Sequence, residues 1–361
     1  MCHNGASIVI SMPVYVFRLK SNCIISVLCC AIALCFFIRY LMLLQYQGKE
    51  LQLLTQGAVE VVPSDDSREI VVFHRFNGRL GNQLFQYAAI VGISKLYGAR
   101  PCFDHNPLGG FFQLEKDLCV RPIPINSTYL DDRQHYATYQ PFTIEGNTVI
   151  TGDLQSYRYF EKTDTLRDVR IQHRFTSEAR VLLARVLSVT LHPVRVAIHV
   201  RKLHRMHEEF FLRFFGNPLP EDYAYLRFPT PRYFEVAMGI FRQLYPGCVF
   251  IVMSDSPKWC TEQPFLQGTD MHIIETHNTP ILDLALIAEC DHVILTRGTF
   301  GWWGAFLGAH ARGGHVLYNA DEFDMSHHIN ANHVVVADFY PPSWVPISVN
   351  LHINNNTQKF Q

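Results

Sequence analysis

The chain of 361 residues is poor in charge, with 17% charged side chains and a net charge of -1. Without an excess of basic residues there is no whole-molecule positive field, which excludes nucleic-acid binding through the phosphate backbone. No GxSxG, P-loop or GxGxxG sequence occurs, so the serine-hydrolase elbow and two familiar phosphate loops are excluded. Hydrophobic residues make up 48%, which excludes global disorder and suits two domains of ordinary size.

Metal-binding patterns are also missing from the sequence. No two aspartates stand two residues apart, so the usual motif for a metal with a nucleotide sugar is absent. The lack of a CxxC pair argues against a zinc ribbon and a thioredoxin-like site. The histidines at 204, 207, 327, 328 and 333 have no acids or cysteines at ligand spacing, so we interpret them as surface or packing residues. We expect neither a metal nor a cofactor.

The first part of the chain has no acidic residue before Glu50. Within it, residues 21–44 are uncharged except for Arg39, which stands near one end, and are rich in apolar side chains. A membrane-spanning helix needs about 20 apolar residues. A cleaved signal peptide is the alternative, but the run exceeds a signal core and no small-x-small cleavage site follows it. We predict a cytoplasmic tail at 1–20, a transmembrane signal anchor at 21–44 and a stem at 45–68.

The charges around this segment predict its orientation. Arg18 and Lys20 precede the apolar run, and positive flanks stay in the cytosol, so the body is expected in the lumen. Two N-glycosylation sequons, at Asn126 and Asn355, agree with that side. Five cysteines follow the anchor, and they allow at most two disulfides, with the pairing left open.

The body alternates short apolar runs with amphipathic segments, as an α/β fold with a parallel sheet does. Thr-Pro pairs open two of the predicted helices, at Pro231 and Pro280. The expected strands are 69–73, 194–200, 248–253, 271–274, 292–295 and 315–318. The expected helices are 82–96, 177–189, 231–245, 280–288 and 301–309, whereas residues 104–150 are turn-rich and unassigned.

Ligands of parallel sheets bind beyond the carboxyl ends of the strands, so we consider the residues that follow four strands. Each turn also has an ordinary alternative: Asn82 as a helix cap, Arg201 as a surface arginine, Asp255 in a cap for the helix from Pro257, and tryptophans packed in the core. The four segments are Gly78-Arg-Leu-Gly-Asn-Gln83, Arg201-Lys202 with His199, Ser254-Asp255, and Thr296-Arg-Gly-Thr-Phe300 before Trp302-Trp303.

These segments, taken together, resemble glycosyltransferase family 11, the α-1,2-fucosyltransferases. The likeness runs from about Val71 to Tyr318 and rests on residues 78–88, 197–201, 254–260 and 283–303. It implies a two-lobed Rossmann-like fold of the GT-B type, with lobes at 69–190 and 191–361. It also implies GDP-fucose as donor, inversion at the sugar and no metal. An anchor with a stem suits a single-pass type II protein of the Golgi membrane.

One departure affects the expected chemistry. The family reads HVRRGD where this chain has His199-Val-Arg-Lys-Leu-His204, so the aspartate is missing. We predict transfer of fucose to a glycan, in α-1,2 linkage to galactose. The alternatives are a fucosyltransferase of another linkage and an inactive, membrane-anchored relative that binds GDP-fucose or glycans. The predicted catalytic residues are Arg201, Glu208 and Glu209. The predicted donor-binding residues are Gly78, Arg79, Gly81, Asn82, Gln83, His199, Ser254, Asp255, Gly298, Thr299 and Phe300.

Overall fold

The computed structural model describes residues 10–12, 15–17, 69–114, 118–131, 137–164, 169–187, 193–202, 227–275, 278–326 and 328–349. The chain divides into two units, residues 1–67 and residues 68–361. In the first unit, β1 (Ile10–Met12) pairs with β2 (Tyr15–Phe17) as an antiparallel hairpin. No helix in the described ranges is long and apolar enough to span a membrane, and the predicted anchor at 21–44 lies outside those ranges.

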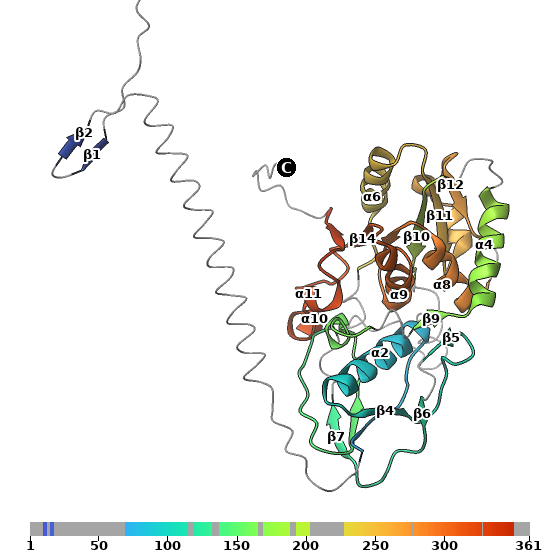
Figure 1. The fold of residues 1–361 in the computed structure, drawn as a ribbon. Coiled ribbons are helices and arrows are strands. Elements are labelled where there is room, and N and C mark those ends of the chain that lie inside the picture. Colours follow the sequence, from blue (N-terminus) through green and yellow to red (C-terminus); the bar gives the residue numbers. More distant parts are fainter. Residues whose placement is uncertain are drawn as a thin grey trace, which may run out of the picture. The chain divides into compact units, whose positions relative to one another are not determined.

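The second unit contains two parallel sheets (Figure 1). The first sheet has the strand order β6-β4-β3-β8-β7, and the second has the order β12-β11-β10-β13-β14-β15. The first comprises β3 (Val71–His74), β4 (Arg100–Phe103), β6 (Cys119–Val120), β7 (Thr128–Asp131) and β8 (Thr148–Thr151). The second comprises β10 (Arg195–Val200), β11 (Val249–Ser254), β12 (Met271–Ile273), β13 (His292–Leu295), β14 (Val316–Asn319) and β15 (Val345–Ile347). The predicted α/β class is therefore confirmed.

Helices cover these sheets, and a short antiparallel pair, β5 (Phe112–Gln113) with β9 (Arg170–Ile171), lies apart from them. The prolines at 231 and 280 begin helices as predicted, although neither preceding threonine makes a side-chain capping bond. The helices are α2 (Leu80–Leu96), α4 (His173–Leu187), α6 (Pro231–Leu244), α7 (Pro257–Thr261), α8 (Pro280–Glu289), α9 (Thr299–Leu307), α10 (His328–His333) and α11 (Val336–Phe339). Short 3-10 turns occupy Tyr157–Tyr159, Pro264–Leu266 and His310–Arg312.

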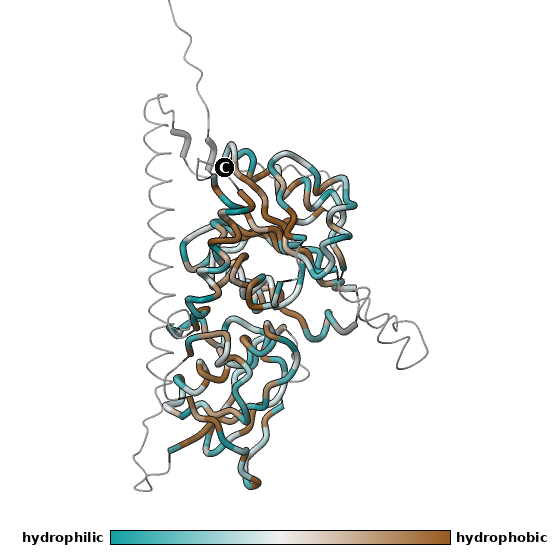
Figure 2. The backbone as a smooth tube through the Cα atoms, turned by 90° about the vertical axis from the view of Figure 1, so that its right-hand side faces the viewer, coloured by the Kyte–Doolittle hydropathy of each residue, from teal (hydrophilic) through white to brown (hydrophobic). Residues whose placement is uncertain are grey.

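The second sheet is buried on both faces, because alternate residues of its strands enter two different cores. Val196, Ile198 and Val252 pack with residues of α6 on one face. Ala197 and Ile251 pack with residues of α8, α9 and α2 on the other. The hydropathy trace shows the strands as hydrophobic stretches inside this part of the molecule (Figure 2). A nearly continuous apolar strand sequence follows from such two-sided burial.

One hydrophobic core extends from the second sheet to the first. Trp302 and Trp303 of α9 are fully buried in it, and the Trp302 indole Nε1 donates to Phe339 O at 2.9 Å. Phe85 of α2 lies against both indoles, at centroid distances of 4.5 and 5.3 Å. The core alternative for the two tryptophans is thus the one that the structure shows. Shared packing of α2 and α9 fixes the turns that begin these two helices.

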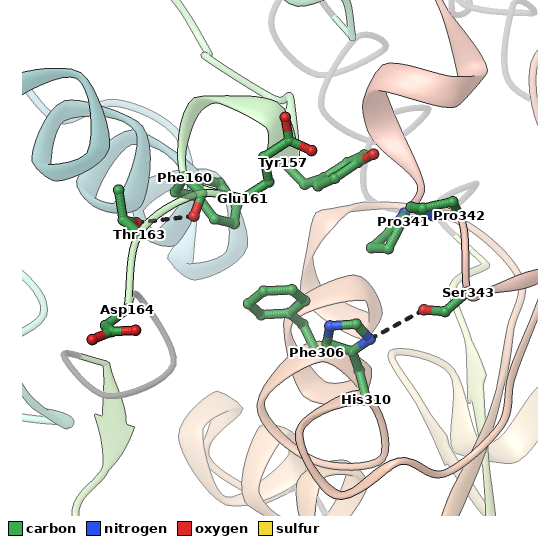
Figure 3. A pocket seen from close by; sticks show the side chains of 10 residues that line it. All are labelled: Tyr157, Phe160, Glu161, Thr163, Asp164, Phe306, His310, Pro341, Pro342 and Ser343. Carbon is green, nitrogen blue, oxygen red and sulfur yellow. Dashed lines mark hydrogen bonds between the residues drawn. The ribbon is translucent and has the colours of Figure 1, made fainter. Parts of the chain in front are cut away.

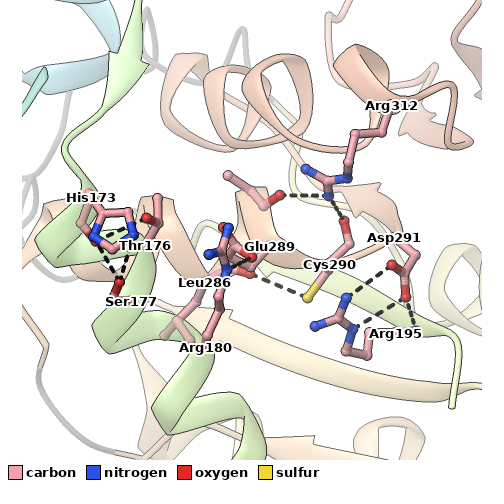
Figure 4. A network of polar contacts seen from close by, with 11 residues as sticks. His173, Thr176, Ser177, Arg180, Arg195, Leu286, Glu289, Cys290, Asp291 and Arg312 are labelled. Carbon is pink, nitrogen blue, oxygen red and sulfur yellow. Dashed lines mark hydrogen bonds and ion pairs between the residues drawn. The ribbon is translucent and has the colours of Figure 1, made fainter. Parts of the chain in front are cut away.

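The amino-terminal edge of the second sheet carries a network of ion pairs (Figure 4). Arg180 of α4 binds Glu289 of α8 through two hydrogen bonds of 2.8 and 3.1 Å. Arg195, at the start of β10, binds Asp291, and Arg312 donates to two carbonyls at the end of α8. These contacts tie α4 to α8 and lie at the edge of the sheet opposite to that where ligands bind.

Several elements were not predicted. Residues 104–150, unassigned from the sequence, contain β5, β6, β7 and most of β8, and the chain after Tyr318 adds α10, α11 and β15. A disulfide joins Cys102 of β4 to Cys119 of β6, whereas Cys248, Cys260 and Cys290 are buried thiols. One disulfide fits the limit of two set by the cysteine count.

Candidate active site

Polar side chains of the second sheet gather beyond the carboxyl ends of β10, β11, β13 and β14. Arg201 follows β10, and Asp255 follows β11. The Arg201 Nη1 lies 3.0 Å from the Asp255 Oδ2. The other oxygen of Asp255 accepts the backbone N–H of Lys202 at 2.8 Å. Because β10 and β11 are adjacent parallel strands, the sheet itself brings these residues together.

The backbone at Arg201 is anchored to the next strand. The Thr296 hydroxyl, just beyond β13, accepts the N–H of Arg201 at 2.9 Å and donates to His199 O at 3.0 Å. Arg297, which is 6% exposed, donates to the carbonyls of Arg201 and Lys202, each at 3.3 Å. The backbone of Arg201 and Lys202 is therefore held in place by Thr296 and Arg297, the two residues that follow β13.

Three guanidinium groups gather here. Burial lowers the pKa of Arg201, the Asp255 carboxylate opposes this shift, and the nearby Arg79 and Arg297 lower the pKa further. Arg79 comes from the turn before α2, on the side of the first sheet. Repulsion between like charges is relieved when an anion binds among them, so this cluster favours a ligand with several negative charges.

The Lys202 side chain lies against two aromatic rings. Its Nζ lies 4.5 Å from the ring centroids of both Phe228 and Trp259, a cation–π arrangement. Burial and then the Arg297 charge lower the pKa of Lys202, whereas Asp255 raises it. Arg201 and Lys202 therefore have different side-chain partners.

The two glycine-rich turns meet between the sheets. The Thr299 hydroxyl donates to Asn82 Oδ1 at 2.7 Å, across 217 residues of sequence. A Cβ at Gly81 would lie 2.7 Å from Phe300 N and Thr299 Oγ1, so only glycine permits this approach. Gly78 has φ 69°, and its carbonyl accepts from the Gln83 side chain at 3.1 Å. The predicted residues 78–83 and 298–300 are therefore neighbours.

Two capping alternatives are not what the structure shows. Helix α2 begins at Leu80, two residues earlier than predicted, with Arg79 at the N-cap and Asn82 bonded to Thr299 instead. Helix α7 has Ser256 at its N-cap without a side-chain capping bond. Asp255 therefore has its side chain on Arg201 and Lys202, and Ser254 accepts the N–H of Ser256 at 2.9 Å.

His199 lies behind the site as a neutral ring. Burial lowers its pKa to about 4, with a further lowering by Arg201 and an opposing effect of Asp255. Its Nδ1 occupies the space beside Gly301, where a Cβ would come within 2.3 Å, and its ring lies 5.5 Å from that of Phe300. The predicted residue thus lies beneath the turn that begins α9.

Glu322 is a further member of the site that the sequence did not reveal. It follows β14, is 1% exposed, and its Oε1 accepts the N–H of Gly298 at 2.9 Å. Arg297 and Thr296 were visible in the sequence as residues of the β13 turn, but no role was predicted for them. Considering every residue that follows a strand would have included all three. Glu208, Glu209, His204 and Asn355 lie outside the described ranges.

The carboxyl end of the first sheet carries acids of its own. Asp104 follows β4 and pairs with Arg75 at 3.3 Å and His105 at 2.7 Å. Asp153 follows β8 between Gly152, with φ 118°, and Leu154, with φ 52°. Burial raises the pKa of Asp153. A non-glycine residue at positive φ is uncommon, so this turn has an unusual backbone that fixes where Asp153 stands.

A pocket of about 600 Å³ lies at the other end of α9 (Figure 3). Phe306 and His310 border it, with stacked rings 4.8 Å apart, and Glu161 and Asp164 contribute carboxylates. At a rise of about 1.5 Å per residue, α9 places Phe306 about 10 Å from Thr299. None of the described residues lining it is Lys or Arg, so it does not suit an anionic donor.

The chain is similar to known proteins over regions that include several of these residues. A family model described as "Glycosyl transferase family 11" matches residues 229–345, which include Asp255, Arg297 and Glu322. The chain is 28% identical over 288 residues to galactoside alpha-(1,2)-fucosyltransferase 2 of Sus scrofa, covering 75% of this chain and 78% of the relative. It is 26% identical over 307 residues to galactoside 2-alpha-L-fucosyltransferase Sec1 of Mus musculus, covering 80% of this chain and 77% of that relative.

Among solved structures, fucosyltransferase NodZ from Bradyrhizobium is similar, with a TM-score of 0.43 and 14% identity over 67% of this chain and 94% of that chain. The relatives match at similar identity over most of their own length. The chain is therefore similar to members of glycosyltransferase family 11, among them the galactoside α-1,2-fucosyltransferases.

Proposed function

We propose that the protein transfers L-fucose from GDP-fucose to a glycan, in α-1,2 linkage to galactose and with inversion at the sugar. The observation that carries the donor assignment is the cluster of Arg201, Arg79 and Arg297 between the two glycine-rich turns. Several positive charges in a partly buried site match a nucleoside diphosphate. The linkage rests on the homologous galactoside α-1,2-fucosyltransferases alone.

The difficult event in such a transfer is the departure of GDP from an oxocarbenium-like sugar. Negative charge then grows on the β-phosphate. Arg201 carries the transition-state stabilisation in this proposal, since its guanidinium can offer a forked pair of N–H donors. Asp255 orients that guanidinium through the 3.0 Å ion pair and has a partly exposed carboxylate for the guanine or ribose. The N–H groups of Thr299 and Phe300, at the start of α9, complete the anion site in this proposal.

Inversion also needs a base for the acceptor hydroxyl. Glu208 and Glu209 remain our proposals for this base. Asp153 is a third candidate, because burial raises its pKa and the turn after β8 stands at the carboxyl edge of the first sheet. A carboxylate with a raised pKa is better matched to proton abstraction near neutral pH. Replacing each of the three by its amide and comparing kcat identifies the base.

We further propose a single-pass type II protein of the Golgi membrane with a lumenal body. The positive charges at Arg18 and Lys20 support this orientation. The Cys102–Cys119 disulfide fits an oxidising compartment, and the sequon residue Asn126 is exposed. The lobe boundaries at 190 and 191 and the stem at 45–68 belong to the same proposal.

The test is an acceptor array with GDP-fucose and the purified full-length protein, followed by linkage analysis of every product. We expect fucose on the 2-hydroxyl of terminal galactose. A product with another linkage would contradict the proposed α-1,2 linkage to galactose and would leave GDP-fucose as the donor. Binding of GDP-fucose without turnover on any acceptor would favour the inactive relative suggested by His204.

A further inference from the structure

Glu322 is an acid buried beneath the donor turn. Its side chain makes two hydrogen bonds to neutral donors: the Gly298 N–H to Oε1 at 2.9 Å, and the Tyr340 hydroxyl to Oε2. Its backbone carbonyl accepts the N–H of Arg227 at 2.8 Å. A residue that is 1% exposed and bonded on both oxygens has a fixed position.

That position matters because the turn is held at three successive residues. Arg297 reaches the carbonyls of Arg201 and Lys202, Gly298 donates to Glu322, and Thr299 donates to Asn82. Gly298 has φ 86°, a conformation that other residues rarely adopt, so the direction of its N–H is set by the turn. Of the three anchors, only Glu322 carries a group that changes charge near neutral pH.

We propose that Glu322 is a positioning residue that holds the turn of residues 297–299 for the donor pyrophosphate and that takes up a proton when the donor binds. This inference rests on the proposed binding of GDP-fucose. Protonation leaves the arrangement intact, because the Oε1 still accepts from Gly298 and a protonated Oε2 can donate to Tyr340.

The groups that face Glu322 explain why it can change charge. Burial raises its pKa to about 7, against the opposing effects of the Tyr340 hydrogen bond, the Gly298 N–H and the Arg297 charge. Tyr233 of α6, Tyr318 of β14 and Tyr340 also face it, and burial together with the Glu322 charge raises the pKa of each phenol. These hydroxyls stay protonated near neutral pH.

The direction of the pH effect follows from the donor's charge. Above pH 7 Glu322 is a carboxylate, and below pH 7 it is neutral. Pyrophosphate charges beside Gly298 raise the pKa of Glu322 further, because like charges repel. By linkage, the donor binds tightly below the free-state pKa and more weakly as pH rises through it, by at most about tenfold per pH unit for one proton.

The experiment is titration calorimetry of the full-length protein with GDP-fucose, without acceptor, from pH 5.5 to 8.5. GDP-fucose is the probe because both of its phosphates are esterified, whereas the terminal phosphate of GDP titrates at a pKa of about 6. His199, with a pKa of about 4, is neutral over this range. We expect Kd to rise about three- to tenfold between pH 6 and 8, with proton uptake shown by the dependence of the heat on the buffer.

Three variants test whether Glu322 is the group that takes up the proton. Glu322→Gln keeps an acceptor for Gly298 and cannot titrate, so its Kd should be independent of pH. Tyr340→Phe removes a hydrogen bond that lowers the pKa of Glu322. The midpoint of the pH dependence of Kd should therefore move to higher pH in this variant. Asp324→Asn is the matched control, because the Asp324 carboxylate binds Arg227 and Ser326 and not the Gly298 turn. The midpoint of the pH dependence of Kd should match the wild type in this variant.

A wild-type Kd that is independent of pH would overturn the inference, as would Glu322→Gln with the wild-type pH dependence. If Glu322→Gln does not fold, the Tyr340→Phe midpoint decides: an unchanged midpoint overturns the inference. Absence of GDP-fucose binding at every pH, in the wild type and in Asp324→Asn, would refute the proposed function and this inference with it.

Discussion

The hydroxyl of Thr299 donates a hydrogen bond of 2.7 Å to the side-chain oxygen of Asn82, and so joins the turn before α9 to the start of α2. The two residues belong to the two glycine-rich motifs described above, one after β3 of the first sheet and one after β13 of the second. Their bond places Arg79 near Arg201 and Arg297, which is the arrangement that favours an anionic donor.

Breaking this bond should lower the free energy of unfolding, and the effects of removing the two partners should not be additive. Asn82→Ala and Thr299→Val each remove one side of it, and the double variant removes both. We expect a coupling free energy of about 0.5–1.5 kcal/mol in the free energy of unfolding, measured with urea. Strictly additive effects of the two substitutions would show that the bond contributes nothing.

The contact at Gly81 should be sensitive to a single methyl group. In Gly81→Ala the new Cβ meets Phe300 N and Thr299 Oγ1 at 2.7 Å, so the two turns must separate. Displacing catalytic groups by about 1 Å can cost about 100-fold in rate, and we expect kcat/KM to fall about 10- to 100-fold.

Gly239→Ala is the matched control for that substitution. Gly239 lies in α6 with open space around its Cβ position, so alanine should raise stability by about 0.5–1 kcal/mol and leave turnover unchanged. Equal losses of turnover in the two variants would contradict the role of the Gly81 contact.

The sequence predicted five of the six strands of the second sheet, all but β15, because two-sided burial makes each of them a short apolar run. Strand β13 (His292–Leu295) was predicted to the residue. The first sheet was harder, since β6 has two residues and β7 is mostly exposed. Such strands have neither the length nor the periodicity that a sequence signal needs.

Part of the candidate site could be predicted from the residues that follow the strands. Residues that directly follow a strand, such as Arg201 and Asp255, were found because the carboxyl edge of a parallel sheet is where ligands bind. Their pairing depends on strand order, which the sequence does not contain. Glu322 lies beyond the last predicted strand, and its bond to Gly298 depends on how β14 and β13 pair.

Metal independence is a prediction of the missing paired aspartates. Guanidinium groups, rather than a cation, should neutralise the pyrophosphate. We expect fucose transfer to continue in EDTA at close to its full rate. A complete loss of activity in EDTA, restored by manganese, would contradict this description of the donor site.

Asn126 should carry an N-glycan if the body is lumenal. It is exposed, and the neighbouring Ile125 is 98% exposed, so the loop before β7 is open to the glycosylation machinery. Asn126→Gln should remove one glycan's mass on a gel, and protease added outside intact microsomes should spare the body. Digestion of the body under those conditions would reverse the orientation.

The central claim is that Arg201 stabilises the departing GDP, and acceptor-dependent GDP release by purified, folded variants tests it most directly. We expect Arg201→Ala to lose about 10²–10³ in rate, in kcat as well as in kcat/KM, because its bonds strengthen as GDP leaves. Arg201→Lys should recover little, since an ammonium cannot form the fork. Lys202→Ala should lose less, because its Nζ lies over Phe228 and Trp259. Near-normal turnover in Arg201→Ala together with a large loss in Lys202→Ala would contradict the account.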